Sequence, residues 1–286
     1  MTEIAAVVLA AGEGRRLRPL TETLPKALCP IGNVALLDRA LARLAGLGMS
    51  GQRRVAVNAH HLRDQVIAHV GDRAHLSVEP DMPLGTAGGL GGLRSWIDGR
   101  AVLVGNADAY LSSPHRAPGP DIAALLNGWD GTTVRLLCVP AGDRPAEFGN
   151  HRFAGFSLLP WSDVVGLAAT PANLVRTTWR PAERAGRLEI IEYQGVYLDT
   201  GTPGDYLEAN LHAAGDGSLI AEDAVVEVLP HHCVIGSGAR VLGRATRAVV
   251  WPGGYVGPEE QLVDAIRAGK ELTVAVGVPT EPVTRP

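Results

Sequence analysis

An apolar run near the N-terminus, and the glycine-rich loop after it, constrain the fold more than any other feature of this chain. Residues 4–9 read IAAVVL. This run is too short to cross a membrane and is typical of a buried parallel strand. The next loop carries Gly12 and Gly14, and glycines let the main chain adopt positive φ and approach a ligand closely. Successive N–H groups in such a loop bind anions, so the pattern predicts an α/β domain that binds phosphate after its first strand.

Basic side chains follow the loop at Arg15, Arg16, Arg18 and Lys26. Guanidinium groups are planar and always charged, which suits phosphate oxygens. A dinucleotide-binding turn would need a third glycine where this chain has Leu17, and a Walker loop would need a closing Gly-Lys-Ser/Thr. The chain therefore has neither loop. Without the dinucleotide-binding turn, an NAD-dependent oxidoreductase is also excluded.

The remaining pattern is a glycine loop, Arg16-Leu17, Pro19, Thr21 and Pro25-Lys26. It resembles the signature of the sugar-1-phosphate nucleotidyltransferases, particularly their mannose-1-phosphate guanylyltransferase-like members. Arg15 stands where the family usually has Thr, and Ala27 where it has Pro. The resemblance implies a three-layer αβα, Rossmann-like (GT-A-like) domain. It also implies two catalytic residues, with Arg16 stabilising the pyrophosphate leaving group and Lys26 bridging the α-phosphate and the attacking phosphate.

A second motif, Pro83-Leu84-Gly85-Thr86-Ala87-Gly88, follows a strand expected at residues 76–79. Local chemistry alone predicts a turn and a helix capped by Thr86. The sequence of this motif resembles that of the family loop whose backbone packs on the nucleobase. There Gly85 and Gly88 would leave room for a flat ring. The implied nucleotide-binding residues are Leu9, Ala10, Ala11, Gly12, Gly14, Arg15, Pro83, Gly85, Thr86, Ala87 and Gly88.

Two aspartates are candidate metal ligands. Asp108 follows an apolar strand at residues 101–104, and ligands of open α/β sheets bind beyond the carboxyl ends of strands. Asp199 opens Asp199-Thr200-Gly201-Thr202-Pro203, which could equally be a turn with Thr202 capping a helix from Gly204 to about Ala213. The resemblance implies that Asp108 and Asp199 hold Mg²⁺, which takes few carboxylates together with phosphate oxygens.

The middle of the chain departs from the family. We expect a short helix over 121–127 and a strand over 132–139, after which the family's Glu-Lys-Pro is missing. Asp143-Arg144-Pro145 could replace it, and residues 153–160 resemble the strand that supplies backbone to the sugar pocket. The sugar-phosphate residues implied by the resemblance are Asn106, Arg144 and Gly155.

From Leu219 the composition changes to small apolar residues. Apolar positions recur at a step of six and, after a slip of two, resume, at Leu229, Ile235, Val241, Val249 and Tyr255. This period predicts a short left-handed hexapeptide β-helix of about two turns. We therefore expect a catalytic domain over 1–215 and a β-helix-like domain with a proline-rich tail over 216–286. So short a coil should pack against the catalytic domain or form a homo-oligomer with a second copy.

Two histidine pairs could suggest metal binding. His60-His61 has no third ligand nearby in sequence, and His231-His232-Cys233 offers only adjacent candidates. A loop role for the first pair and structural packing for the second are the favoured interpretations. The family often carries a similar Asn-x-x-His at Asn58–His61, so a part in shaping the nucleotide site stays open.

Composition narrows the partners. A formal net charge of −4 and 5% aromatic residues argue against a nucleic-acid platform. The three cysteines show no metal or redox spacing, and neither a secretory signal nor a membrane span is evident. We expect a cytoplasmic protein that acts on small molecules.

Together these features predict transfer of a nucleoside monophosphate from a nucleoside triphosphate to a sugar 1-phosphate, releasing pyrophosphate, with GTP and mannose 1-phosphate or a related sugar phosphate as the best guess. The alternative is a catalytically silent regulatory or scaffolding homologue that binds nucleotide sugar. The eroded sugar-phosphate motif favours that alternative, and intact Arg16, Lys26, Asp108 and Asp199 weigh against it.

Overall fold

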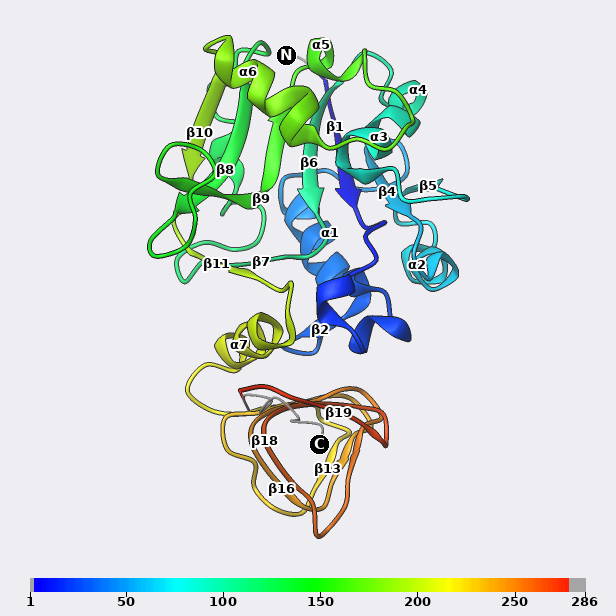
Figure 1. Cartoon of the computed structure of the whole chain (residues 1–286), viewed down its shortest axis with the longest axis vertical. Coiled ribbons are helices and arrows are strands. Elements are labelled where there is room, and N and C mark those ends of the chain that lie inside the picture. The colour runs from blue at the N-terminus through cyan, green and yellow to red at the C-terminus, as the bar shows by residue number, and fades with distance from the viewer. Residues whose placement is uncertain (1–2, 278–286) are drawn as a thin grey trace, which may run out of the picture. The chain divides into compact units, whose positions relative to one another are not determined.

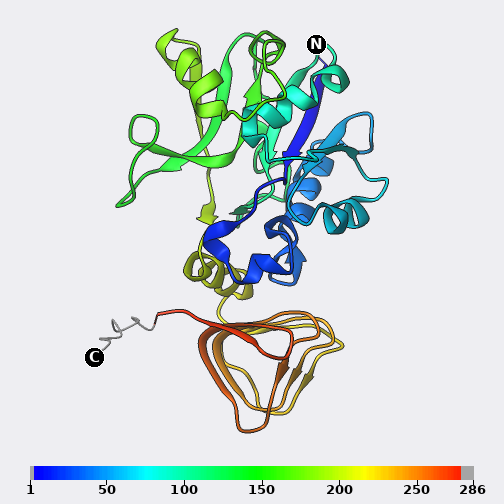
Figure 2. The ribbon, with the colours of Figure 1, turned by 45° about the vertical axis from the view of Figure 1, so that its right-hand side comes forward.

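The computed structural model describes residues 3–277, so the proline-rich tail lies outside the described residues. The chain forms two compact units (Figures 1 and 2). The first comprises residues up to Gly14, Leu24–Cys29 and Leu36–Tyr197. The second comprises Arg15–Thr23, Pro30–Ala35 and residues from Leu198 onward. Within residues 3–277 no helix has the length and apolar character needed to cross a bilayer.

A seven-stranded sheet forms the centre of the first unit, in the order β10-β8-β9-β6-β1-β4-β5. The β6, β1, β4 and β5 strands are parallel to one another, whereas β9 runs antiparallel to both β6 and β8. The strands are β1 (Ile4–Leu9), β4 (Val55–Ala59), β5 (His75–Val78), β6 (Ala101–Asn106), β8 (Val134–Pro140), β9 (His151–Leu159) and β10 (Leu188–Glu192).

The strand order reverses beside β1. From β1 the chain moves outward through β4 to β5 and then returns to place β6 on the other side of β1. The loops after β1 and β6 therefore diverge, which opens a crevice beyond the carboxyl ends of these strands. The predicted phosphate loop and the predicted metal-ligand loop both begin at this edge of the sheet.

Alternating side chains of β1 divide the apolar core into two layers. Ala6 and Val8 pack into one core with α1 (Leu36–Gly46) and α2 (Arg63–Val70). Val7 packs into the other. That second core also contains residues of α3 (Gly85–Gly92), α4 (Arg94–Ile97), α5 (Trp161–Val164) and α6 (Arg180–Arg184). Helices thus cover both faces, and the three-layer αβα prediction is confirmed.

The middle of the first unit differs from expectation. The short helix predicted over residues 121–127 is confirmed only in part, since Ala123–Leu125 form a 3₁₀ helix and the rest of the range forms turns. Asp121 instead accepts hydrogen bonds from buried Arg43 (3.0 Å) and from the Gly119 amide (2.9 Å), which hold this segment in turns. The sequence also did not predict β7 (Ala109–Ser112), β10 or the π-helical turn Val175–Trp179 before α6.

In the second unit, α7 (Pro203–Ala214) begins as predicted. The Thr202 hydroxyl accepts a hydrogen bond from the Asp205 amide (3.2 Å), with Pro203 in the first turn. Tyr206 is fully buried, and its hydroxyl bonds the Pro30 carbonyl and accepts from Trp251 (2.9 Å). Asn210 accepts from the Gly32 amide (3.0 Å). These bonds join α7 to the small hairpin of β2 (Pro30–Ile31) and β3 (Val34–Ala35) and to the C-terminal coil.

The C-terminal coil is a β-helix of short stacked strands, seen nearly down its axis in Figure 2. One column joins β12 (Leu219–Ile220), β14 (Val234–Ile235), β16 (Arg244–Val250) and β18 (Gln261–Ala268) in parallel. A second joins β13 (Val225–Val226), β15 (Arg240–Val241) and β17 (Tyr255–Val256). The last strand, β19 (Leu272–Ala275), pairs antiparallel with β18.

The repeat inside this coil departs in part from the predicted positions. Ile235 and Val241 lie in its apolar core, as the period of six predicts. Leu229 is wrong as a core position, because its side chain is 87% exposed and it lies in no strand. Tyr255 is only half-buried, and Val256 occupies the core instead. The column of four strands also exceeds the two turns predicted. A strict period of six misses turns of the coil when the loops between strands differ in length.

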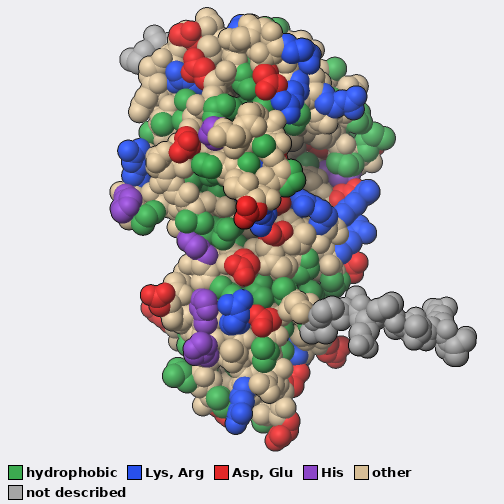
Figure 3. Space-filling view, turned by 60° about the vertical axis from the view of Figure 1, so that its left-hand side comes forward, with side chains coloured by type: hydrophobic (Ala, Val, Ile, Leu, Met, Phe, Trp, Pro, Cys, Tyr) green, Lys and Arg blue, Asp and Glu red, His purple; other side chains and the backbone are tan. Residues whose placement is uncertain are grey.

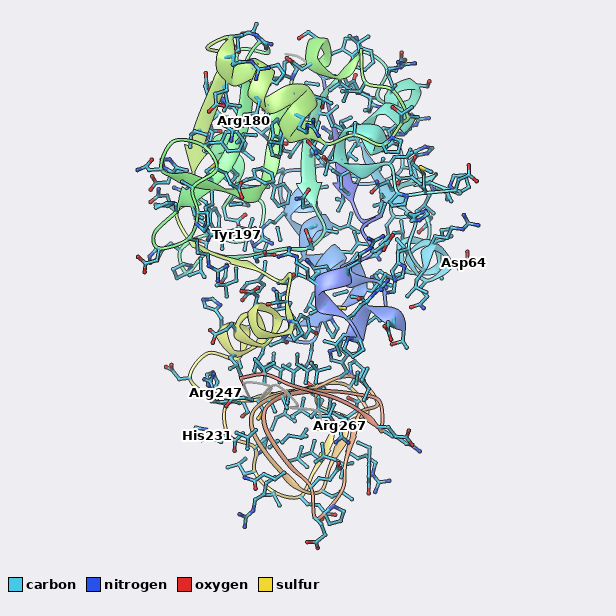
Figure 4. The ribbon with its side chains drawn as sticks, in the orientation of Figure 1. Asp64, Arg180, Tyr197, His231, Arg247 and Arg267 are labelled. Carbon is cyan, nitrogen blue, oxygen red and sulfur yellow. The ribbon has the colours of Figure 1, made fainter. Side chains whose placement is uncertain are left out.

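Ion pairs connect side chains within the coil. Arg247, labelled with His231 at one edge in Figure 4, donates to Asp264 (2.7 Å). Buried Arg267 donates to Glu260 (2.6 Å), and this bond lowers the pKa of the Glu260 carboxyl. Cys233 is buried in the coil core and His232 contacts the Leu211 carbonyl (3.2 Å), which agrees with a packing role. Within the described part of the chain, no cluster of three or more His, Cys, Asp or Glu could hold a metal.

The functional boundary predicted at residue 215 stays a prediction, although α7 groups with the β-helix in one compact unit.

On the face shown in Figure 3, basic and acidic side chains are interspersed, without a broad area of one sign.

Candidate active site

A pocket of about 190 Å³ lies in the first unit, where the loops after β1, β5 and β6 meet beside Asn58 of β4. It is the crevice expected at the reversal of strand order. Its lining combines small apolar groups with a few polar side chains: Leu9, Ala10, Ala11, Gly12, Lys26, Ala27, Asn58, Pro83, Gly85, Thr86, Asn106, Ala107 and Asp108.

Most residues predicted from the sequence motifs line this one pocket. It brings together the glycine loop, the second motif and Lys26 with Asn106 and Asp108. Ala87 and Gly88 are buried behind the second loop and do not line it, and Gly14, Arg144 and Gly155 lie outside its lining. Arg15, Arg16 and Asp199 belong to the second unit. Three lining residues were not predicted as site residues: Ala27, Asn58 and Ala107.

The two glycines of the first loop serve different purposes. Gly14 has φ of +62°, so the turn itself requires glycine there. Gly12 has no positive φ, and a Cβ built on it would meet no protein atom within 4 Å. Neither backbone strain nor packing within the protein requires glycine at position 12. The space beside position 12 is therefore open to a ligand.

The second loop is held by a neighbouring backbone segment. A Cβ on Gly85 would lie 2.5 Å from the Ala172 carbonyl oxygen, and one on Gly88 would lie 2.3 Å from that of Thr170. Packing inside the protein therefore requires these glycines, and their expected role in leaving room for a base stays a prediction. Thr86 does not cap α3, because its hydroxyl accepts from the Leu174 amide (2.8 Å).

Lys26 and Asp108 form a close ion pair at the pocket. The distance between Lys26 Nζ and Asp108 Oδ2 is 2.7 Å, although the residues are 82 positions apart. The Lys26 side chain is 9% exposed, whereas that of Asp108 is 43% exposed. A desolvated ammonium beside an accessible carboxylate is suited to receiving further anionic groups.

Burial also determines the protonation state of the Cys29 thiol, which lies close to Lys26 in sequence. Cys29 is fully buried, and desolvation raises the pKa of its thiol to about 12, with the positive charge of Lys26 acting in the opposite direction. The thiol therefore remains protonated at neutral pH and provides no nucleophile.

In the second unit, Arg16 lies against Asp199. The distance between Arg16 Nη2 and Asp199 Oδ2 is 3.6 Å, and the Arg16 side chain is 66% exposed. A Cβ on Gly201 would lie 2.6 Å from the same Arg16 nitrogen. Gly201 thus gives the guanidinium room beside the Asp199-Thr200-Gly201 turn.

The residues predicted to bind sugar phosphate are dispersed. Asn106 ends β6 and lines the pocket. Gly155 lies within β9 at φ of +88°, and a Cβ there would lie 2.3 Å from the Ala109 side chain, so packing explains this glycine. Arg144 is exposed in the loop after β8.

The oxygen ligands at the pocket suit a hard cation. Asp108 offers a partly exposed carboxylate, and the described residues hold no cage of three or more protein ligands. Mg²⁺ is bound by one or two carboxylates together with water and substrate phosphates. The donor set therefore fits Mg²⁺.

Comparison with known proteins agrees with this geometry. The Nucleotidyl transferase family model matches residues 5–117, which include all of β1 except Ile4, the second motif and Asp108. Mannose-1-phosphate guanyltransferases of Emericella nidulans and Aspergillus fumigatus are each 28% identical over 229 residues, 71% of this chain. The matched region spans 62% of the length of these two relatives.

One further relative and one solved structure extend the comparison. The N-acetylmuramate alpha-1-phosphate uridylyltransferase of Caulobacter vibrioides is 34% identical over 201 residues, 68% of this chain and 74% of the relative. A solved structure from Bacillus anthracis, described as a glucose-1-phosphate thymidylyltransferase, has a TM-score of 0.59 at 18% identity. It covers 74% of this chain and 96% of that chain, a likeness of fold. The chain belongs to the nucleotidyl transferase family, among its sugar-1-phosphate nucleotidyltransferases.

Proposed function

We propose that this protein transfers a nucleoside monophosphate from a nucleoside triphosphate to a sugar 1-phosphate, giving a nucleotide sugar and pyrophosphate. The observation that carries the proposal is the pocket itself. There a glycine needed neither for strain nor for packing, a desolvated lysine and an accessible aspartate line one crevice at the reversal of strand order.

The reaction needs positioning and charge compensation rather than a covalent intermediate. A sugar phosphate oxygen attacks the α-phosphorus in line, and pyrophosphate leaves. Two phosphate charges at about 4 Å repel by roughly 4 kcal/mol at an effective dielectric of 20. The ammonium of Lys26, only 9% exposed, is suited to offset this repulsion between the α-phosphate and the attacking phosphate.

Arg16 and Asp199 receive their roles from the sequence motifs. In our proposal the Arg16 guanidinium stabilises the pyrophosphate leaving group, for which its planar donors suit phosphate oxygens. The pairing of Arg16 with Asp199 supports treating the two residues together.

A divalent cation, which we propose is Mg²⁺, would be held by Asp108 and Asp199 together with substrate phosphates. When bound, it would neutralise part of the triphosphate charge. Because each residue contributes a lone carboxylate, Mg²⁺ should bind weakly to the free protein and tightly only with a nucleotide present. Calorimetry with and without GTP measures this difference, and micromolar binding without nucleotide would contradict it.

For the nucleotide and sugar, we propose GTP with mannose 1-phosphate or a related sugar phosphate, supported by the guanyltransferase relatives. A second candidate pair is UTP with N-acetylmuramate 1-phosphate, favoured by the 34% identity to the Caulobacter vibrioides uridylyltransferase. The cytoplasmic location, the functional boundary at residue 215 and a homo-oligomer formed through the β-helix also remain proposals.

The test is a screen of the five common nucleoside triphosphates against a panel of sugar 1-phosphates, including both pairs, with pyrophosphate release as the readout. We expect release with one nucleotide and one sugar phosphate well above all others. A protein that binds nucleotide but releases no pyrophosphate with any pair would favour the regulatory alternative. The family relatives and the intact Lys26–Asp108 pair do not favour that alternative.

A further inference from the structure

A buried chain of hydrogen bonds connects the two loops that line the pocket. The Ala10 amide, in the first loop, donates to Asn58 Oδ1 (2.7 Å). Asn58 Nδ2 donates to Glu79 Oε1 (2.7 Å). The Leu84 amide, in the second loop, donates to Glu79 Oε2 (2.8 Å). Two side chains therefore fix the separation of loops that are not neighbours in sequence.

Both connecting side chains are withdrawn from solvent. Asn58 is 2% exposed and Glu79 is 3% exposed. The Glu79 backbone is held as well. The Glu79 amide donates to the Ala59 carbonyl (2.9 Å), and His60 Nδ1 donates to the Glu79 carbonyl (2.7 Å). A buried carboxylate is costly unless strong hydrogen bonds satisfy it, so this arrangement needs a reason beyond filling space.

A third residue, Gly89 of α3, leaves space for these bonds. A Cβ built on Gly89 would lie 2.7 Å from Asn58 Nδ2 and 3.2 Å from Glu79 Oε1. Gly89 has no positive φ, so backbone conformation does not require glycine there. The helix that follows the second loop is thus shaped around the Asn58–Glu79 contact.

The direction of every bond is determined by its ends. The Ala10 and Leu84 amides can only donate, which turns the oxygen of Asn58 toward Ala10 and its nitrogen toward Glu79. Glu79 must then accept at both oxygens, as an ionised carboxylate does. An amide at position 79 would leave two donors facing each other in any orientation of the Asn58 side chain.

We propose that Asn58 and Glu79 are positioning residues that hold the two pocket loops at the separation needed to bind the nucleoside triphosphate. The inference rests on the proposed function, because the occupant between the loops is taken to be the nucleotide. Neither residue carries out chemistry. Their effect should reach the reaction through nucleotide binding and leave the sugar 1-phosphate largely unaffected.

A reciprocal exchange of side chains tests this. Asn58→Asp alone places two carboxylates against each other, and Glu79→Gln alone places two donors together. The double variant Asn58→Asp/Glu79→Gln restores a complementary set, because the carboxylate at position 58 can accept from both neighbours and the new amide oxygen can accept from Leu84. Asp81→Asn, an exposed change of the same charge near Glu79, is the matched control.

The first readout is amide hydrogen exchange at Ala10 and Leu84 in the ligand-free protein. Each single variant should accelerate exchange at both amides by about tenfold or more, and the double variant should return both to within about threefold of wild type. Asp81→Asn should leave both unchanged. Exchange that stays slow in both single variants would overturn the proposal.

The second readout is the KM for GTP, or for UTP if the screen selects UTP. Each single variant should raise it about tenfold and the double variant should recover most of that loss, with the KM for sugar 1-phosphate changed by less than about twofold throughout. A double variant no better than Asn58→Asp would mean that Asn58 contacts nucleotide directly, and would overturn the positioning role. If the variants show the expected pattern of amide exchange but the wild-type protein has no turnover, the proposed function fails and the positioning role stands.

Discussion

Two cation–carboxylate pairs, one in each compact unit, join residues that the sequence motifs single out, and their environments differ sharply. Lys26 and Asp108 approach to 2.7 Å, with the lysine side chain 9% exposed. Arg16 and Asp199 are 3.6 Å apart, with the arginine side chain 66% exposed. The first pair is short and its lysine is nearly buried, whereas the second is longer and its arginine is mostly exposed.

The difference indicates where charge is preorganised. An ion pair in a desolvated site interacts more strongly and reorients less than an exposed one, which usually contributes under about 1 kcal/mol to stability. We therefore expect Lys26 and Asp108 to dominate the rate, and Arg16 to contribute less until a ligand orders it. The following variants test that ranking, from the largest expected effect to the smallest.

Asp108→Asn should have the largest effect. It removes the proposed metal-ligand charge while keeping the side-chain shape, and it takes the counter-charge from a nearly buried lysine. Turnover should fall by at least about 10²–10³-fold. Pyrophosphate release at several Mg²⁺ concentrations measures this, with Asp98→Asn, an exposed residue before the start of β6, as the control. Turnover within about twofold of wild type would contradict the metal role.

Lys26→Ala should lower turnover by about 10²–10³-fold, some 2.7–4 kcal/mol, with nucleotide affinity weakened much less. The reason is that charge accumulates mainly when the two phosphates are brought together. Steady-state kinetics combined with GTP binding separates the two effects. Lys26→Met keeps the apolar stem, and Lys270→Ala changes the other lysine of the chain. An equal loss in affinity and turnover would assign Lys26 to ground-state binding.

Arg16→Ala should cost less, about 10- to 10²-fold in turnover, and change the free energy of unfolding by under about 1 kcal/mol. Gly201→Ala offers a graded version, because its Cβ would lie 2.6 Å from the Arg16 guanidinium and displace it without removing it. Kinetics and chemical denaturation report the two quantities. If Arg16→Ala lowers turnover more than Lys26→Ala, the ranking drawn from burial is wrong.

Arg144→Ala should have the smallest effect, since this side chain is exposed in a loop. If it replaces the missing Glu-Lys-Pro, the KM for sugar 1-phosphate should rise about three- to tenfold, with that for the triphosphate nearly unchanged. Arg144→Lys keeps the charge and should retain most of the affinity. Similar effects on both substrates would place Arg144 outside the sugar-phosphate site.

The local sequence pattern predicted the structure best where a strand leads into a glycine-rich loop. The strand predicted at residues 4–9 matches β1, and the residues of the first two motifs that follow strands meet in one pocket. Prediction failed where a distant partner decides the local structure. Arg43, far away in sequence, binds the Asp121 side chain, and only Ala123–Leu125 of the helix predicted there forms, as a 3₁₀ helix. The exposed Leu229 matches the repeat but is not packed against the coil core.

The sequence by itself determined the family signature, the alternation of apolar side chains in the first strand and the residue types available to handle phosphate. These depend on the order of neighbours along the chain, which local periodicity and spacing record. The tertiary structure alone decided that Lys26 lies against Asp108, that Gly85 and Gly88 serve packing, and that Asn58 and Glu79 connect two loops. Such contacts depend on which strands pair and where their order reverses, and that follows from long-range packing rather than from any local pattern.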